Sequence, residues 1–271
     1  MRAALPAAAL LCATSLAAAA ETPAPEVDAR GIVLQALERA ASNVEEGVEL
    51  RYRSLMKREV RRYDGDGRVE EVRTGDYEVV PLDGARYERR LTVDGRPLNA
   101  EEQEGERRRE ADFREARRRA RGDDNDDEPD DDEIVFDEEL IERYDVAFEA
   151  EEVFRGRPSY RISFEPRPGR LPVRRRIDHA LNKARGQIWI DKETYEAARV
   201  EFELIDRVRL WWGILGNIMQ ARGSLDRGPV LGDLWGYLQL ETYSDVRVLL
   251  SRSRRADIRR WHDHEPLGPQ P

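Results

Sequence analysis

Residues 185–205, RGQIWIDKETYEAARVEFELI, constrain the fold most, because they predict one β-hairpin with an apolar face and a charged face. In the first strand, Ile188 and Ile190 alternate with polar positions and with Trp189. The second strand alternates in the same way, with apolar Ala198, Val200, Phe202 and Leu204 between Arg199, Glu201 and Glu203. A period of two is the signature of a strand, and a charged return face indicates a sheet that is wet on one side. The apolar side must therefore be covered by a packed core, a plug or a bound lipid.

The same one-faced pattern recurs along most of the chain. Residues 144–150 and 160–164 predict a second hairpin around the turn at 155–158, and further strands are predicted over 48–56, 69–80, 87–93, 220–225, 234–243 and 246–250. Sequential strands of this kind, joined by short turns, form a large antiparallel sheet that curls around its own apolar face. The predicted fold is mainly β with α (α+β): a large curved antiparallel sheet, an incomplete β-barrel, closed by helices.

Two segments predict helices. Apolar residues recur at helical spacing over 32–41, and Gly47 is a typical stop after such a helix. Residues 99–121 instead carry acids four residues before arginines, which supports a helix exposed to solvent. With little that is apolar except Phe113, this helix is expected to project or to lie loosely on the sheet. The acidic run 123–133 that follows predicts a disordered linker. The whole insertion, at about 99–133, is either a docking arm for a basic partner or a solvated connection.

The first twenty residues predict an export signal that is cleaved after Ala20. Arg2 precedes an apolar run, and small residues stand at Ala18 and Ala20. A retained membrane anchor is the alternative interpretation. Cys12, the single cysteine of the chain, lies inside this segment, so residues 21–271 would have neither disulfides nor a thiolate. We expect these residues to form one domain in the periplasm.

Charge and residue types narrow the classes of function. The net charge is −10, which disfavours nucleic acid as a partner. No nucleophile elbow, phosphate-binding glycine loop or zinc-protease helix is present. His262 and His264 flank Asp263, but no spacing suggests a third zinc ligand. The Asp-Gly pairs at 64–67 predict a hairpin turn, since the acids and the downstream Glu of a calcium loop are missing. We expect no enzyme activity, no metal and no cofactor.

What remains is the apolar face itself. The candidates for lining a lipid-binding cavity are Val48, Leu50, Tyr52, Val146, Phe148, Tyr160, Ile162, Phe164, Ile188, Ile190, Val200, Phe202 and Leu204. The alternative is that these residues are core, packed by the N-terminal helix and by the segment that begins at residue 211. Adjacent tryptophans beside glycines suit a lid or a membrane-contacting loop, and the candidates there are Trp211, Trp212, Ile214 and Leu215.

Two stretches carry a family resemblance: GRPSYRISFEP at 156–166 and GQIWIDKETY at 186–195. With the predicted export signal and leading helix, they resemble the LolA-like outer-membrane lipoprotein-sorting proteins and their relatives, LolB and the RseB/MucB stress sensors. The resemblance is strongest over 144–206. It implies an incomplete β-barrel closed by helices around a hydrophobic cavity for acyl chains, and it brings no catalytic residues. The charged insertion and the early strands depart from the family pattern.

The sequence thus predicts a periplasmic carrier or binding protein for the acyl chains of lipids or lipoproteins, with peripheral membrane contact as a further possibility. The alternative is an envelope stress sensor or scaffold of the same fold, which binds a protein partner and carries no cargo. In that case the charged insertion would hold the partner.

Overall fold

A computed structural model describes residues 27–121, 138–210, 216–249 and 251–268. Its helical elements are α1 (Ala29–Glu45), the 3-10 turn η1 (Val48–Leu50), α2 (Ala100–Ala120), α3 (Glu138–Glu142) and α4 (Asp178–Leu181). Its strands are β1 (Tyr52–Tyr63), β2 (Val69–Leu82), β3 (Ala85–Arg90), β4 (Thr92–Val93), β5 (Arg96–Pro97), β6 (Tyr144–Phe154), β7 (Arg157–Pro166), β8 (Ala184–Asp191), β9 (Ala197–Leu204), β10 (Val208–Leu210), β11 (Gly216–Leu231), β12 (Leu234–Val248) and β13 (Ser251–Pro266).

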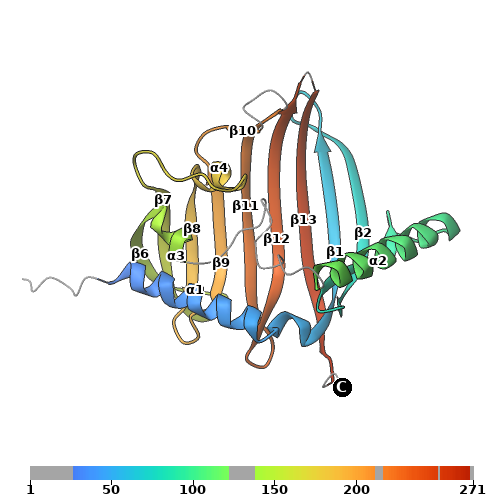
Figure 1. Ribbon diagram of the computed structural model, residues 1–271, viewed down its shortest axis with the longest axis horizontal. Helices are drawn as coiled ribbons and strands as arrows, with labels where there is room; N and C mark the ends of the chain where they lie inside the picture. The colour runs from blue at the N-terminus through green and yellow to red at the C-terminus, as the bar shows by residue number, and fades with distance from the viewer. Residues whose placement is uncertain (1–26, 122–137, 211–215, 250, 269–271) are drawn as a thin grey trace, which may run out of the picture.

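One antiparallel sheet dominates the structure (Figure 1). Its strand order is β3-β2-β1-β13-β12-β11-β9-β8-β7-β6, and β10 continues the line of β9 along β11. The outermost strands, β3 and β6, do not pair with each other, so the sheet stays open and is not closed into a barrel. This confirms the predicted fold class.

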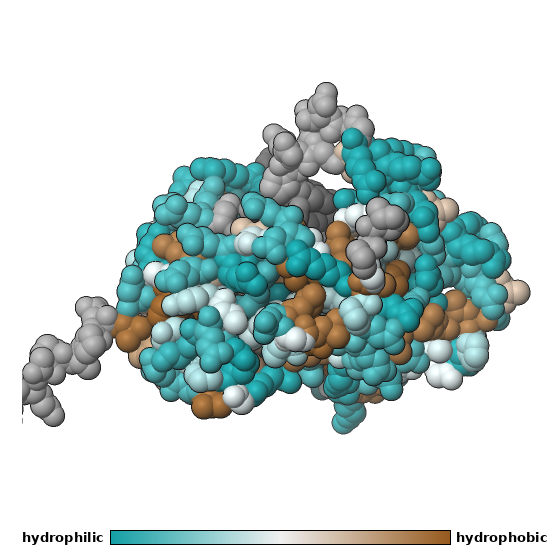
Figure 2. All heavy atoms as spheres, turned by 90° about the horizontal axis from the view of Figure 1, so that it is seen from below, coloured by the Kyte–Doolittle hydropathy of each residue, from teal (hydrophilic) through white to brown (hydrophobic). Residues whose placement is uncertain are grey.

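Helix α1 crosses one face of the sheet near its lower end (Figure 1). Figure 2 views the molecule from this lower end and shows patches of hydrophobic residues among hydrophilic ones. Asp28 caps its first turn by accepting a hydrogen bond from the backbone N–H of Gly31. The helix ends before Gly47, whose φ of 59° is the left-handed conformation that a glycine adopts without strain. Its apolar stripe, Ala29, Ile32 and Ala36, packs on the sheet. We call the face that meets α1 the inner face and the opposite one the outer face.

Helix α2 is better anchored than the sequence suggested. Its N-terminus is closed by a capping box between Asn99 and Glu102. The Phe113 ring lies 5.0 Å from that of Tyr87 on β3, and Tyr87 is buried. No residue of α2 is buried, which fits the expectation of a helix that projects or lies loosely on the sheet; the aromatic pair adds a contact that was not predicted. The far end of α2 extends past the edge of the sheet (Figure 1).

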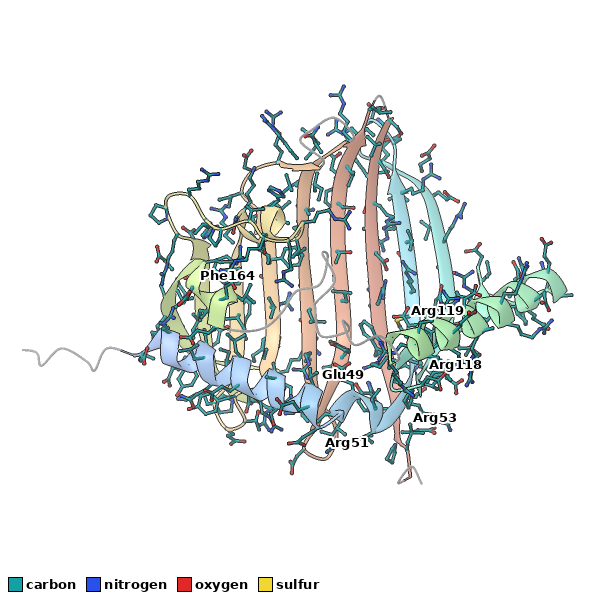
Figure 3. All side chains as sticks on the ribbon, in the orientation of Figure 1. Glu49, Arg51, Arg53, Arg118, Arg119 and Phe164 are labelled. Atoms are coloured by element: carbon teal, nitrogen blue, oxygen red, sulfur yellow. The ribbon has the colours of Figure 1, made fainter. Side chains whose placement is uncertain are left out.

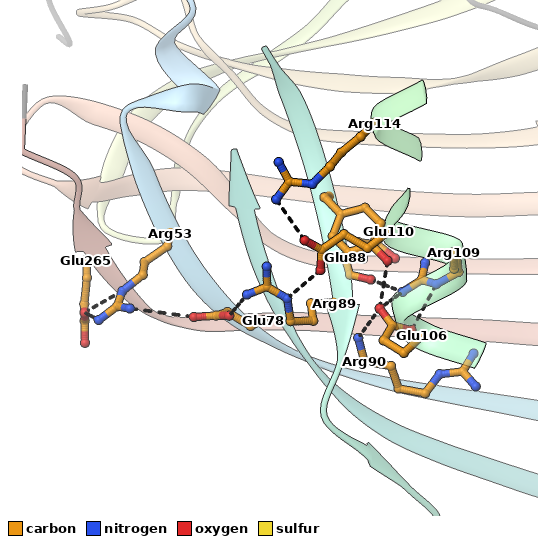
Figure 4. Close-up of polar contacts among 11 residues, drawn as sticks. Arg53, Glu78, Glu88, Arg89, Arg90, Glu106, Arg109, Glu110, Arg114 and Glu265 are labelled. Atoms are coloured by element: carbon orange, nitrogen blue, oxygen red, sulfur yellow. Dashed lines mark hydrogen bonds and ion pairs between the residues drawn. The ribbon is translucent and has the colours of Figure 1, made fainter. Parts of the chain in front are cut away.

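Ion pairs surround this aromatic contact (Figure 4). Arg89 on β3 binds Glu110 of α2 at 3.3 Å and Glu78 of β2 at 2.8 Å. Glu106 of α2 accepts hydrogen bonds from the Tyr87 hydroxyl and from the Arg109 guanidinium. The helix is thus held by charged contacts along one side.

Three further expectations need correction. Val48 and Leu50 lie in η1, not in the first strand, because the left-handed Gly47 is followed at once by a 3-10 turn. The two strands predicted over 234–250 are one continuous strand, β12. Strand β13 was missed, although it pairs with both β1 and β12 in the middle of the sheet.

The outer face is not uniformly wet. Trp189, predicted to face solvent, is buried with Trp235 and Ala198, and Phe154 packs on them. The Trp189 indole N–H also donates to Glu152. The prediction was wrong here because neighbouring strands supply a second, small apolar cluster.

Several predictions fall outside the described residues: the export signal at 1–20, the acidic run at 123–133, and the lid candidates Trp211, Trp212, Ile214 and Leu215. Among the residues that are described, no helix combines the length and apolar character needed to cross a membrane.

Candidate ligand-binding face of the sheet

The strand register gathers the predicted apolar residues on the inner face. One row crosses neighbouring strands from β6 to β12 and consists of Phe148, Ile162, Ile188, Val200, Leu225 and Leu240. The next row holds Val146, Phe164, Gly186, Phe202 and Gly223. Tyr160 pairs with Ile190, and Leu204 with Ala184. The hairpins therefore bring together every predicted cavity residue from β6 to β9.

Helix α1 covers one end of this apolar face. Ile162 and Ile190 are fully buried beneath it, and Val146, Phe148, Tyr160 and Ile188 pack around them. These residues behave as core, which is the alternative that the sequence left open for each of them.

The other end of the face remains partly exposed. Phe164, Val200, Phe202 and Leu204 are half-buried, as are their neighbours Leu225 and Leu240. We call these six residues the apolar patch. Where the chain is described, α1 makes its main strand contacts with β6 and β8. The patch is therefore apolar surface that the described part of the chain leaves partly exposed.

Two glycines shape the floor of the patch. The Phe164 ring, labelled in Figure 3, lies over Gly186, where a Cβ would come within 2.7 Å of the ring and 1.8 Å of the Glu201 carbonyl oxygen. The Phe202 ring lies over Gly223 in the same way, 2.8 Å from the position of a Cβ. Aromatic rings thus fill the space that side chains would take, and they present their faces along the sheet.

A buried carboxylate fastens α1 above the face. Glu196 is 2% exposed and accepts hydrogen bonds from Asn43 at 2.7 Å, Arg39 at 3.1 Å and Arg227 at 2.8 Å. Asn43 and Arg39 belong to α1, whereas Arg227 lies on β11. This network fixes the second half of the helix without apolar contacts.

Next to it, aromatic and basic side chains close the inner face at the lower end of β1 and β12. Arg86 donates to the Tyr52 hydroxyl at 2.9 Å, and its guanidinium lies over the rings of Tyr52 and Tyr237. Burial raises the pKa of both tyrosines and lowers the pKa of His264, whose ring stands 5.5 Å from Tyr52. Of the predicted cavity residues here, Val48 and Tyr52 are buried and Leu50 is half-buried.

Beyond this cluster the inner face turns ionic. Arg58 of β1 binds Asp257 of β13 through two nitrogens, and Arg259 reaches Glu88 at 3.0 Å. Arg58 and Arg259 continue the row that contains Leu240, and Asp257 continues the row that contains Gly223. The same face also holds a buried apolar cluster on β1, β2 and β13, formed by Met56, Tyr77 and Val79 with Trp261 packed on them. The half-buried apolar patch itself lies on β7–β12.

A hollow of about 630 Å³ lies across the middle of the outer face. The side chains of outer parity along it are mainly polar: Glu149, Ser163, Glu165, Arg185, Gln187, Glu201, Glu203, Arg222, Ser224, Glu241 and Tyr243. Arg185 binds Glu203 at 2.7 Å, and the Arg222 guanidinium lies 4.9 Å from the Tyr243 ring centre. Phe164, Gly186, Phe202 and Gly223, which belong to the row of the apolar patch, also line the hollow, so it presents polar and apolar surface together.

The described residues hold no group of three or more His, Cys, Asp or Glu side chains arranged to bind a metal. His262 binds Asp263 at 2.9 Å, and His264 approaches the Tyr237 carbonyl oxygen at 3.2 Å.

The two motifs that carry the family resemblance pack against each other. Arg157 from the first binds both carboxylate oxygens of Asp191 from the second, and Asp191 is fully buried. Asp191 also accepts from the backbone and hydroxyl of Thr194 and so closes the turn before β9. Arg157, Asp191 and Thr194 therefore build the β6–β9 hairpins, whereas Phe164 and Gly186 of the same motifs contribute to the patch.

Leu225 and Leu240 were missed as site residues. Both lie in predicted strands at alternating positions, and that alternation was the available signal. Their place beside Val200 follows only from the long-range pairing of β9, β11 and β12.

No protein-family model matches the chain, and no curated protein matches it. Solved structures do. An outer-membrane lipoprotein-sorting protein domain from Vibrio parahaemolyticus is 13% identical with a TM-score of 0.32, over 87% of this chain and 93% of that one. A LolA superfamily protein from Nitrosomonas europaea is 12% identical with a TM-score of 0.27, over 86% and 94%. Pseudomonas aeruginosa MucB, in its complex with MucA, is 12% identical with a TM-score of 0.25, over 86% and 99%.

The matched structures include a lipoprotein-sorting domain, a LolA superfamily protein and MucB, which are the kinds of protein that the sequence resembles. At such identities and TM-scores they carry no further argument.

Proposed function

We propose that residues 21–271 form one periplasmic domain of LolA-like fold that binds the acyl chain of a lipid or lipoprotein on the apolar patch, without covalent chemistry. The observation that carries this proposal is the half-buried row from β7 to β12, which continues past the part of the face that α1 covers. Export to the periplasm is supported by the signal-like pattern of the first twenty residues.

The dimensions of the patch suit a hydrocarbon chain. It spans β7, β8, β9, β11 and β12, and neighbouring strands lie roughly 4.8 Å apart, which gives a track of about 19 Å. An acyl chain with about fourteen buried methylenes would gain on the order of 11 kcal/mol. Immobilising it costs about 4 to 15 kcal/mol. The balance favours moderate, reversible affinity, as a carrier requires.

The test is uptake of a fluorescent fatty acid by the purified exported protein, followed by mass spectrometry of co-purified lipid. Phe202→Asp places a charge in the middle of the patch and is expected to abolish uptake. Val153→Asp is the matched control, because Val153 is 72% exposed at the lower end of β6 and away from the patch. Absence of both bound lipid and uptake in the unmodified protein would refute the proposal, as would equal uptake by the two variants.

A second candidate is a scaffold or sensor that binds a protein partner and has no cargo. The hollow on the outer face favours it, since a mixed polar and apolar lining suits a peptide. The two candidates separate in one experiment: in the scaffold, Glu241→Lys in the hollow would abolish a pull-down of envelope proteins, while Val200→Asp, on the patch and outside the lining of the hollow, would not. Deletion of residues 99–133 tests whether the charged insertion holds the partner.

A further inference from the structure

The hairpin tips at the upper end of the sheet form a surface of their own (Figure 1). We define this hairpin end as residues 61–73, 204–209, 216–220, 245–249 and 251–255. The strand pairing places these segments side by side: Tyr63 pairs with Arg254, Val248 with Ser251, and Ile218 with Val208 and Val246. Arg254 further donates to the carbonyl oxygens of Asp64 and Gly65, which joins the β1–β2 and β12–β13 hairpins.

The hairpin end is positively charged in an acidic protein. It holds ten arginines against six Asp and Glu residues, a net charge of +4, whereas the whole chain has a net charge of −10. Figure 3 shows side chains with nitrogen atoms around this end. Arg209, Arg247 and Arg255 are exposed and form no ion pair with a carboxylate within the described chain. These three charges are available to an external anion.

The same end also exposes aliphatic side chains. Of the eleven large apolar side chains that are exposed in the described chain, six lie here: Val69, Val72, Ile205, Met219, Val248 and Leu249. Single exposed apolar residues are ordinary on a protein surface, but a concentration of them among basic residues is typical of a membrane-binding surface.

The tip of the β12–β13 hairpin is the least ordinary part. Three other hairpins place a glycine at the second of two left-handed positions: Asp83 and Gly84, Asp94 and Gly95, Arg155 and Gly156. The β8–β9 turn places Tyr195 in the left-handed conformation, but Tyr195 is half-buried. At the β12–β13 tip, Leu249 takes a left-handed conformation with a φ of 52° and is 67% exposed. A branched aliphatic residue there gains nothing from folding in water, because neither the backbone conformation nor the exposure favours it.

We propose that the hairpin end docks on an anionic bilayer surface, with Val248 and Leu249 entering the interface and the unpaired arginines contacting lipid headgroups. Charge complementarity selects this occupant, since anionic headgroups attract arginines that lack an internal partner. The proposal goes beyond acyl-chain binding and uses residues outside the apolar patch.

The test is co-sedimentation of the purified exported protein with phosphatidylcholine vesicles that contain or lack phosphatidylglycerol. Binding is expected only with phosphatidylglycerol and is expected to weaken as salt is added. One arginine near such a surface contributes about fivefold to partitioning, so Arg209→Glu/Arg255→Glu should lower it by at least about tenfold. The control pair, Arg108→Glu/Arg170→Glu, removes two exposed arginines elsewhere and should leave binding unchanged apart from a small effect of net charge.

Leu249→Asp tests the apolar contribution and should weaken vesicle binding severalfold, whereas Val153→Asp should not. Equal binding to neutral and anionic vesicles, no binding to either, or equal loss in the test and control pairs would overturn the proposal. Fatty-acid uptake should survive Arg209→Glu/Arg255→Glu, so failure of membrane docking is distinguishable from failure of acyl-chain binding. If Leu249→Asp abolished capture of a protein partner but left vesicle binding intact, the surface would be a protein interface.

Discussion

Replacement of Glu196 by alanine should detach the second half of α1 from the sheet. Glu196 is 2% exposed and accepts three hydrogen bonds, two of them from guanidinium groups. Without it, Asn43 and Arg227 lose their partner while remaining largely buried. Removing one member of a buried ion pair costs about 3 to 5 kcal/mol. Because Arg39 is 41% exposed and can return to water, we expect the lower end, about 3 kcal/mol of the free energy of unfolding.

Urea unfolding, followed by tryptophan fluorescence, measures this loss, and hydrogen exchange locates it. Amides of α1 from residue 39 onward should exchange faster in Glu196→Ala than those of β12 and β13. The conservative Glu196→Gln keeps one acceptor oxygen and should lose less. Glu104→Ala is the control, since Glu104 and its partner Arg107 are both exposed and such pairs add little. If Glu196→Ala unfolded at the same urea concentration as Glu104→Ala, the inferred role of the buried network would be wrong.

Three other predictions concern the sheet and its attachments. Gly186→Ala should lower the free energy of unfolding by about 3 kcal/mol or more, because its Cβ would overlap a carbonyl oxygen of the neighbouring strand. Gly105→Ala, in open space on α2, is the control and should raise the free energy of unfolding by about 1 kcal/mol. Comparable losses for the two variants in urea unfolding would contradict the geometry. Phe113→Ala should speed hydrogen exchange throughout α2 and leave the central strands unchanged, and unchanged exchange in α2 would mean that the ion pairs alone hold it. Burial raises the pKa of Tyr144 to about 12. The stability that the protonated Tyr144 adds is therefore fully present below pH about 10 and is lost as the pH rises toward 12. Tyr144→Phe should reduce this alkaline loss of stability in a pH series of unfolding curves, and an unchanged slope would exclude Tyr144 as its cause.

The hairpins of β6–β9 were predictable from sequence because most of their apolar residues alternate onto one face, Trp189 and Phe154 being exceptions. Strand β13 was not, although it is central. Its inner positions carry Asp257 and Arg259 where an apolar residue would mark a strand. Asp257 is accommodated there by Arg58, which lies 199 residues earlier in the chain. Because the neutralising arginine lies so far away in the sequence, the residues around Asp257 show no local alternation of apolar and polar side chains from which a strand could be predicted.

The alternation of apolar and polar residues also predicted which residues share the face of the candidate site, but not how much of that face is covered. The period of two placed Val200 and Phe202 on the correct face, but it could not say which part of that face α1 covers. That division depends on Glu196, whose partners come from α1 and from β11. In the sequence, Glu196 is one acid among many, so its burial is a property of the assembled fold alone.

The division of the inner face also limits what the chain can bind. An acyl chain on the apolar patch meets α1 and its buried core at one end, and the ionic rows of β13 and β1 at the other. Crossing toward β1 would bury hydrocarbon against Arg58 and Asp257, and their desolvation would oppose the gain from burial. A bound chain is therefore expected to run across β7–β12. Lengthening a series of fatty acids should raise affinity only until that track is filled, and affinity that keeps rising with chain length would show that the ionic rows are no boundary.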